Sequence, residues 1–131
     1  MFLNLETDYA IRIVHTLAVS DSRLDAKTIA ARTGVTPRFT LKILHGLVSS
    51  GIVKSYKGAS GGYILAKDAN EITLLDVVEQ TCGPLELSQC QSEGECTHPD
   101  GFCRFRGVFS DVSEYMKQKF SNITFAENVK E

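Results

Sequence analysis

The feature that most restricts the fold is a pair of helix start and stop signals in close succession. Asp25 is a good N-cap for a short helix, which Gly34 can end in the left-handed conformation. Thr36 and Pro37 form a second start signal, because threonine caps helices and proline is favoured at the first helical position. The second helix extends to about Ser50. Two helices joined by a tight glycine-containing turn predict a helix-turn-helix.

The second of these helices has an apolar face and a polar face. At helical spacing, Phe39, Ile43, Leu44 and Leu47 form the face that would pack on the core. The other side chains would point outward, where they could enter the major groove of DNA. The candidates for DNA contact are Thr36, Arg38, Thr40, Leu41, Lys42 and His45. The alternative is an ordinary helical hairpin with a solvated polar face, and the helices alone do not separate the two.

A β-hairpin is predicted directly after the two helices. Residues 52–56 and 62–66 are strand-like runs on either side of a glycine-rich tip. Helix, turn, helix, hairpin is the element order of a winged helix. Because glycine permits close backbone approach, Lys57 and Ser60 at the tip are further candidates for contact with phosphates or the minor groove.

The charge of the chain differs between its two halves. Residues 1–66 hold eight Lys or Arg against four Asp or Glu, whereas residues 67–131 hold six against twelve. A basic half is what a nucleic-acid surface requires, although many solvated faces are basic by chance. We therefore expect a DNA-binding region over residues 1–66 and a sensor and dimerisation region over residues 67–131.

A further constraint comes from three thiols within fourteen residues, Cys90, Cys96 and Cys103. Residues 90–103 have no helical or strand period, and an irregular loop of this length in a small domain usually carries function. A disulfide leaves one of three thiols over, whereas an iron-sulfur cluster or zinc can use all three with a ligand from elsewhere. Direct redox switching by the thiols is the alternative without a metal.

Two other helices flank these features. The first begins with Thr7 as a plausible N-cap, and Asp8 in its first turn is favoured there by the helix dipole whatever else it does. The second covers residues 72–80, with Thr73 as a candidate cap, and leads into the cysteine loop. We expect Cys82, at its end, to be a small buried residue, with a redox role as the alternative.

The longest amphipathic pattern predicts a helix over about residues 104–121. Its apolar stripe recurs at spacings of three and four and consists of Phe105, Val108, Phe109, Val112, Met116 and Phe120. The stripe needs a partner surface, which is either the winged domain of the same chain or a second copy in a two-fold dimer. We assign no chemistry to residues 123–129.

Several classes of protein are not supported by the sequence. The first nineteen residues have no basic leader and no long apolar run, so we expect a cytoplasmic protein without a signal peptide or membrane span. We find no phosphate-binding loop, no nucleophile with a recognisable base and no acid pair, so we do not expect an enzyme. A metal-carrying interaction or electron-transfer protein that does not bind DNA remains an alternative.

Four parts of the chain together resemble the family of winged-helix regulators that includes IscR and NsrR. They are the run Thr7-Asp8-Tyr9-Ala10-Ile11-Arg12, the turn from Ile29-Ala30 to Gly34-Val35, the glycine-rich wing, and the three-cysteine loop. The resemblance implies a mainly α fold with a small β-hairpin wing, in which a winged helix-turn-helix is followed by a long C-terminal dimerisation helix. It also implies a homodimeric transcription factor that senses iron, redox state or nitric oxide through an iron-sulfur cluster, 4Fe-4S or 2Fe-2S.

The resemblance also implies ligands for that cluster. Cys90, Cys96 and Cys103 match the three cysteine ligands in order, although the second gap is one residue longer than usual. IscR-like members add a histidine soon after the third cysteine, and this sequence has none there. NsrR-like members use an aspartate of the first helix, contributed by the partner subunit. Asp8 occupies that position, and His98 is the alternative fourth ligand.

The recognition helix points to the same subgroup. Leu41 stands where IscR carries a glutamate, so the pattern is closest to the nitric-oxide sensor NsrR. We therefore expect a repressor that binds operator DNA as a homodimer under control of an iron-sulfur cluster. A cluster-free regulator that depends on thiols or zinc is the main alternative.

Overall fold

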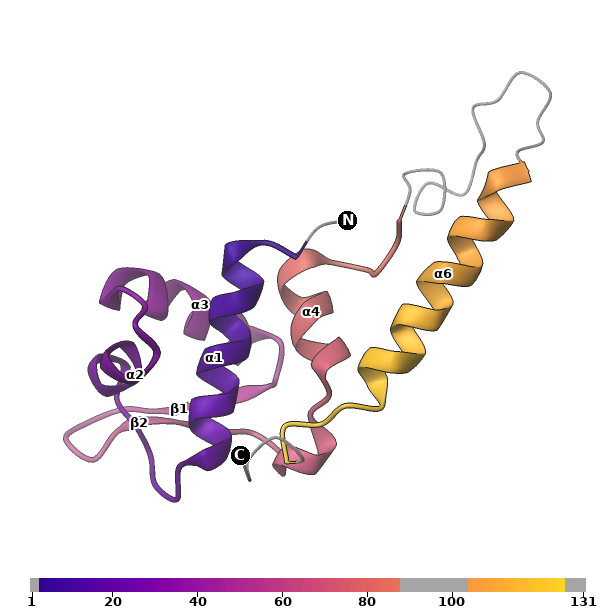
Figure 1. Cartoon of the computed structure of the whole chain (residues 1–131). Coiled ribbons are helices and arrows are strands. Elements are labelled where there is room, and N and C mark those ends of the chain that lie inside the picture. Colours follow the sequence, from indigo (N-terminus) through magenta and orange to yellow (C-terminus); the bar gives the residue numbers. More distant parts are fainter. Residues whose placement is uncertain (1–2, 88–103, 127–131) are drawn as a thin grey trace.

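The computed structural model describes residues 3–87 and 104–126, so the cysteine loop with Cys90, Cys96, His98 and Cys103 lies outside the described residues. The element order matches the predicted winged helix, mainly α with one antiparallel hairpin (Figure 1). The elements are α1 (Leu5–Val19), α2 (Ala26–Thr33), α3 (Pro37–Ser49), β1 (Val53–Tyr56), β2 (Gly62–Leu65), a short 3-10 helix η1 (Ala69–Glu71), α4 (Leu74–Cys82) and α6 (Arg104–Ser121).

The predicted signals set the ends of α2 and α3. Asp25 Oδ1 accepts a hydrogen bond from the Thr28 N–H at 2.7 Å, and Gly34 ends α2 at φ 74°. Hydrogen bonds from the Thr28 side chain and backbone lower the pKa of Asp25 below its ordinary value. Thr36 Oγ1 accepts from the Phe39 N–H at 3.3 Å. Both helices of the helix-turn-helix are therefore fixed by local capping chemistry.

The start of α1 differs from the prediction. Asn4 is the N-cap, and its Oδ1 accepts a hydrogen bond from the Thr7 N–H at 2.8 Å. The prediction that Thr7 caps this helix is therefore wrong. Thr7 is fully buried, because it lies on the side of α1 that packs against α4. The predicted cap of α4 is confirmed, since Thr73 forms a capping box with Asp76.

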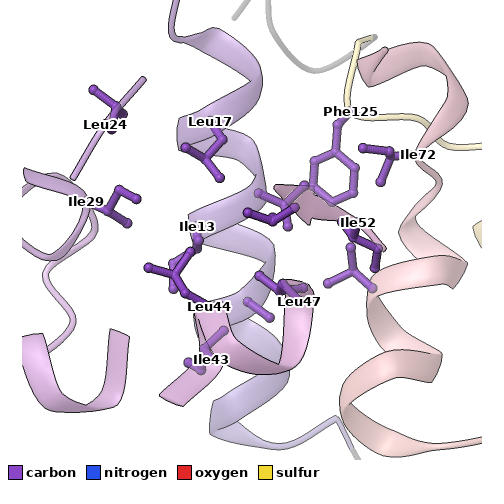
Figure 2. Packing of buried hydrophobic residues seen from close by; sticks show 14 residues of the cluster. Ile13, Leu17, Leu24, Ile29, Ile43, Leu44, Leu47, Ile52, Ile72 and Phe125 are labelled. Carbon is purple, nitrogen blue, oxygen red and sulfur yellow. The ribbon is translucent and has the colours of Figure 1, made fainter. Parts of the chain in front are cut away.

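The core is built around α1, which lies between the helix-turn-helix and α4 (Figure 1). Leu44 and Leu47 of α3 are buried, as predicted from their helical spacing, and they share one cluster with Ile13 and Leu17 of α1 (Figure 2). The same cluster includes Ile72 before α4 and Phe125 after α6. Residues from both halves of the sequence therefore share one core.

The hairpin is attached to the loop between α1 and α2. β1 and β2 pair antiparallel from Val53↔Leu65 to Tyr56↔Gly62. On the other edge of β2, Leu24 pairs with Tyr63 through backbone hydrogen bonds of 2.8 and 3.2 Å. Gly62 allows this approach, because its φ is 148° and a Cβ there would lie 2.9 Å from the Leu24 oxygen.

The segment after α6 returns to the winged domain. The Phe125 N–H donates to the Ile72 oxygen at 3.2 Å, and the Leu74 N–H donates to the Ile123 oxygen at 2.8 Å. Residues 123–126 thus close the core at the base of α4, although the sequence had suggested no role for them. Of the described helices, none is both long and apolar enough to cross a membrane.

Candidate DNA interface and sensor site

The face of α3 that the sequence assigns to DNA is exposed at every predicted position except one. The exposed positions are Thr36, Arg38, Leu41, Lys42 and His45, and Lys57 and Ser60 at the tip of the wing are exposed as well. Leu41 keeps 51% of its surface exposed. A side chain that no element of the described chain covers is available to an external partner.

Thr40 is the exception, and its prediction as a DNA contact is wrong. It is completely buried, because it shares the helical stripe of Ile43, Leu44 and Leu47. Within residues 3–87 and 104–126, its hydroxyl oxygen has no hydrogen-bond partner. A buried hydroxyl without a partner costs roughly 1–3 kcal/mol.

We expect Thr40→Val to raise the free energy of unfolding by about 1 kcal/mol, because valine keeps the shape and removes the unpaired hydroxyl. Thr33→Val is the matched control, since the buried Thr33 hydroxyl donates to the Ile29 oxygen at 2.8 Å. That variant should be less stable than wild type. Urea unfolding measures both. Equal destabilisation of the two variants would contradict the assignment, and a loss of DNA affinity in Thr40→Val would restore Thr40 as a contact.

The recognition helix is tied to the first turns of α1 by a chain of side chains. Tyr9 meets Phe39 edge-on, with ring centroids 5.5 Å apart. The Lys42 ammonium lies 5.4 Å from the Phe39 centroid and 3.9 Å from a carboxylate oxygen of Glu6. Phe39 is therefore half-buried between α1 and α3, and it packs against the edge of the central hydrophobic cluster. A shift of α1 would move both a packing contact and a cation of α3.

Asp8 lies on the exposed side of the same turn of α1. Its carboxylate is 2.8 Å from the Arg12 guanidinium, and about half of each side chain is exposed. Arg12 also donates to the Thr33 oxygen at 3.3 Å, at the end of α2 just before the glycine turn. Arg12 thus joins Asp8 to the helix-turn-helix. Sequence reasoning assigned no role to Arg12 or Glu6. The spacing of four residues between Asp8 and Arg12 was a signal for their ion pair on one helix face, whereas nothing in the local sequence indicated the contacts of Arg12 with Thr33 or of Glu6 with Lys42.

The start of α1 also contacts the end of α4, where the chain leads toward the cysteine loop. Thr7 Oγ1 lies 2.7 Å from Thr81 Oγ1 and 2.8 Å from Cys82 Sγ. Cys82 is therefore half-buried and in polar contact, which corrects the expectation of a small buried apolar residue. These contacts join the first turn of α1, which also carries Asp8, to the last turn of α4.

The predicted cysteine ligands and His98 cannot be placed in this arrangement, because they lie outside the described residues. Within the described part of the chain, no group of three or more His, Cys, Asp or Glu side chains could hold a metal ion. Of the predicted ligands, Asp8 is the one with a known position. Its exposed carboxylate is a hard oxygen donor that iron accepts, and Arg12 is its present partner.

Comparison with known proteins gives consistent results. The model of the Rrf2 family, described as an iron-dependent transcriptional regulator, matches residues 3–131. IscR of Klebsiella pneumoniae is 31% identical over 101 residues, which are 77% of this chain and 61% of that protein. Two solved structures share the fold. CymR, the global cysteine regulator of B. subtilis, has a TM-score of 0.82 at 21% identity over 98% of this chain and 96% of that one. IscR of T. potens has a TM-score of 0.78 at 24% identity over 99% of this chain and 87% of that one.

Proposed function

The chain belongs to the Rrf2 family of DNA-binding transcriptional regulators, and we propose that its affinity for operator DNA is set by an iron-sulfur cluster. In this proposal Cys90, Cys96 and Cys103 bind the cluster, and Asp8 of the second subunit supplies the fourth ligand. Residues 1–66 bind DNA, and residues 67–131 form the sensor and dimerisation region. The relatives are transcriptional regulators and not enzymes.

The observation that carries the proposal is the position of Asp8. Its exposed carboxylate can be reached from outside the subunit, and it is joined through Arg12 to the end of α2. Three thiolates and one carboxylate are a suitable donor set for iron, with the carboxylate as the more weakly held ligand. When bound, the cluster supplies a centre that reacts with nitric oxide or oxygen.

The residues of α1 carry the response to α3. When Asp8 is bound elsewhere, Arg12 loses its carboxylate partner but keeps its hydrogen bond to the Thr33 oxygen. The contacts of Tyr9 with Phe39 and of Glu6 with Lys42 join the same turn of α1 to the recognition helix. A change at Asp8 is therefore transmitted through packed side chains to the surface that meets DNA.

A homodimer formed through α6 completes the proposal. The described part of α6 leaves Phe105, Val108, Phe109 and Val112 between 37% and 62% exposed. An apolar stripe of this size on a helix favours association with a second copy. Two recognition helices about 34 Å apart would then match a palindromic operator.

The decisive test is anaerobic purification followed by visible absorption and by iron and sulfide assays. We expect bound iron and sulfide, tight binding of the loaded protein to operator DNA, and release of the DNA after addition of nitric oxide. The apo-protein, prepared with a chelator, is the control. A preparation without iron and without visible absorption would exclude the cluster while leaving the DNA-binding assignment in place.

A second function is favoured by the similarity to CymR. A regulator without a cluster would use its thiols directly or bind zinc. In that case the DNA affinity of the iron-free protein should change on addition of a thiol oxidant or of zinc. The protein should show no iron-sulfur absorption band that nitric oxide could alter.

A further inference from the structure

The wing is held by a residue outside the hairpin. Arg23 lies in the loop between α1 and α2, and its guanidinium carbon is 3.6 Å from the centroid of the Tyr56 ring. Its Nη1 also donates to the Ser60 oxygen at 3.3 Å. One side chain therefore contacts the last residue of β1 and the tip of the wing.

The next residue strengthens this attachment. Leu24 pairs with Tyr63 through two backbone hydrogen bonds, at the start of β2. Arg23 and Leu24 thus clamp the hairpin from one edge, the first through its side chain and the second through its backbone. An isolated two-stranded hairpin is at best marginally stable in water, so such external contacts determine where its tip lies.

The tip carries the basic residue that the wing would present to DNA. Lys57 to Ser60 are exposed, and the ladder of β1 and β2 ends at Tyr56↔Gly62. Within the tip, the Gly61 N–H donates to the Gly58 oxygen at 3.0 Å. The direction of Lys57 therefore depends on how the turn is held against the body of the domain, and the contact from Arg23 to Ser60 holds it.

We propose that Arg23 is a positioning residue for DNA binding, which orients the wing so that Lys57 meets the phosphate backbone. This rests on the proposed DNA contact of the wing. The planar guanidinium is suited to the task because it can stack on the ring and donate in the plane at once, which a lysine ammonium cannot do. The Arg23 guanidinium interacts with Tyr56 and Ser60 within the protein, and the Lys57 ammonium supplies the charge that contacts the phosphate.

The test compares Arg23→Ala, Arg23→Lys, Lys57→Ala and the double variant Arg23→Ala/Lys57→Ala. The readout is affinity for a mixed-sequence DNA duplex as a function of salt, measured by fluorescence anisotropy. A positioning role predicts that Arg23→Ala and Lys57→Ala each lower the salt slope by about 0.9 per bound subunit, the value for one lost phosphate contact. The double variant should lose no more, and Arg23→Lys should resemble Arg23→Ala although it keeps the charge.

A direct phosphate contact by Arg23 would overturn the proposal, and it predicts a different pattern. The slope of the double variant would then fall by about 1.8 per bound subunit, and Arg23→Lys would bind like wild type. Unchanged affinity in Arg23→Ala would also overturn it. Lys119→Ala, which removes an exposed cation in the last turn of α6, controls for net charge.

A second measurement does not require DNA. Amide hydrogen exchange at Gly61, whose N–H donates to the Gly58 oxygen, should be faster in Arg23→Ala and unchanged in Lys57→Ala. Exchange at wild-type rates in Arg23→Ala would exclude the clamp. If wild type itself fails to bind the duplex while exchange responds as expected, the clamp stands and the proposed DNA contact of the wing fails.

Discussion

Replacing Phe125 with alanine is expected to lower the free energy of unfolding by about 3–5 kcal/mol, the usual cost of removing a buried phenylalanine. Phe125 keeps only 4% of its surface exposed and lies in the same cluster as Leu17, Ile52 and Ile72 (Figure 2). Its backbone is also paired with Ile72. The variant should therefore weaken the packing at the base of α4 and the attachment of α6. Urea unfolding monitored by circular dichroism measures the change in the free energy of unfolding.

Phe105→Ala is the matched control, because the same side chain is removed from a position that is 62% exposed. We expect a change within about 0.5 kcal/mol at concentrations where the protein is monomeric. In a dimer formed through α6, the same variant should instead weaken association, so its cost should rise with protein concentration. A loss in Phe105→Ala as large as in Phe125→Ala, at every concentration, would contradict the arrangement described above.

The winged-helix core could be predicted because its signals are local. Asp25, Gly34 and Thr36 set helix ends through contacts within three or four residues, and the spacing of Ile43, Leu44 and Leu47 identifies the buried face. Thr40 was misassigned because its polarity was given more weight than its place in that spacing. A residue three positions before Ile43 and four before Leu44 belongs to the buried stripe whatever its side chain.

The contacts that could not be predicted join segments far apart in the sequence. Arg23 meets Ser60 across 37 positions, and Thr7 meets Cys82 across 75. Phe125 lies in the short segment after α6. This segment has no apolar period, so the sequence could not show whether the Phe125 side chain is buried or exposed. The carboxylate of Asp8 could be identified through a family pattern, but its link through Arg12 to Thr33 required the packing of α1 against α2.

Asp8→Ala is expected to have the largest effect on the sensor. If Asp8 is the fourth ligand, the variant should lose iron roughly tenfold faster or more under oxygen or nitric oxide, since even outer-shell changes at metal sites cost 10–100-fold in affinity. The measurement is the decay of visible absorption together with retained iron after gel filtration. The DNA affinity of the apo-protein is measured alongside, because the variant also lacks the ion pair between Asp8 and Arg12 and any change there reports on that contact alone.

Glu6→Ala and Arg12→Ala separate the roles within this turn of α1. Glu6 is an acidic residue of the same first turn, so its variant controls for charge and for the helix dipole, and it should retain iron like wild type. Arg12→Ala keeps the Asp8 carboxylate but loses the hydrogen bond to the Thr33 oxygen. It should therefore bind the cluster, and its visible absorption should change on addition of nitric oxide, while its DNA affinity no longer follows that change.

Retention of iron and a wild-type nitric oxide response in Asp8→Ala would remove Asp8 from the site and leave His98 as the fourth ligand to test. An Arg12→Ala protein whose DNA affinity still follows the cluster would place the coupling in the contact between Tyr9 and Phe39 instead.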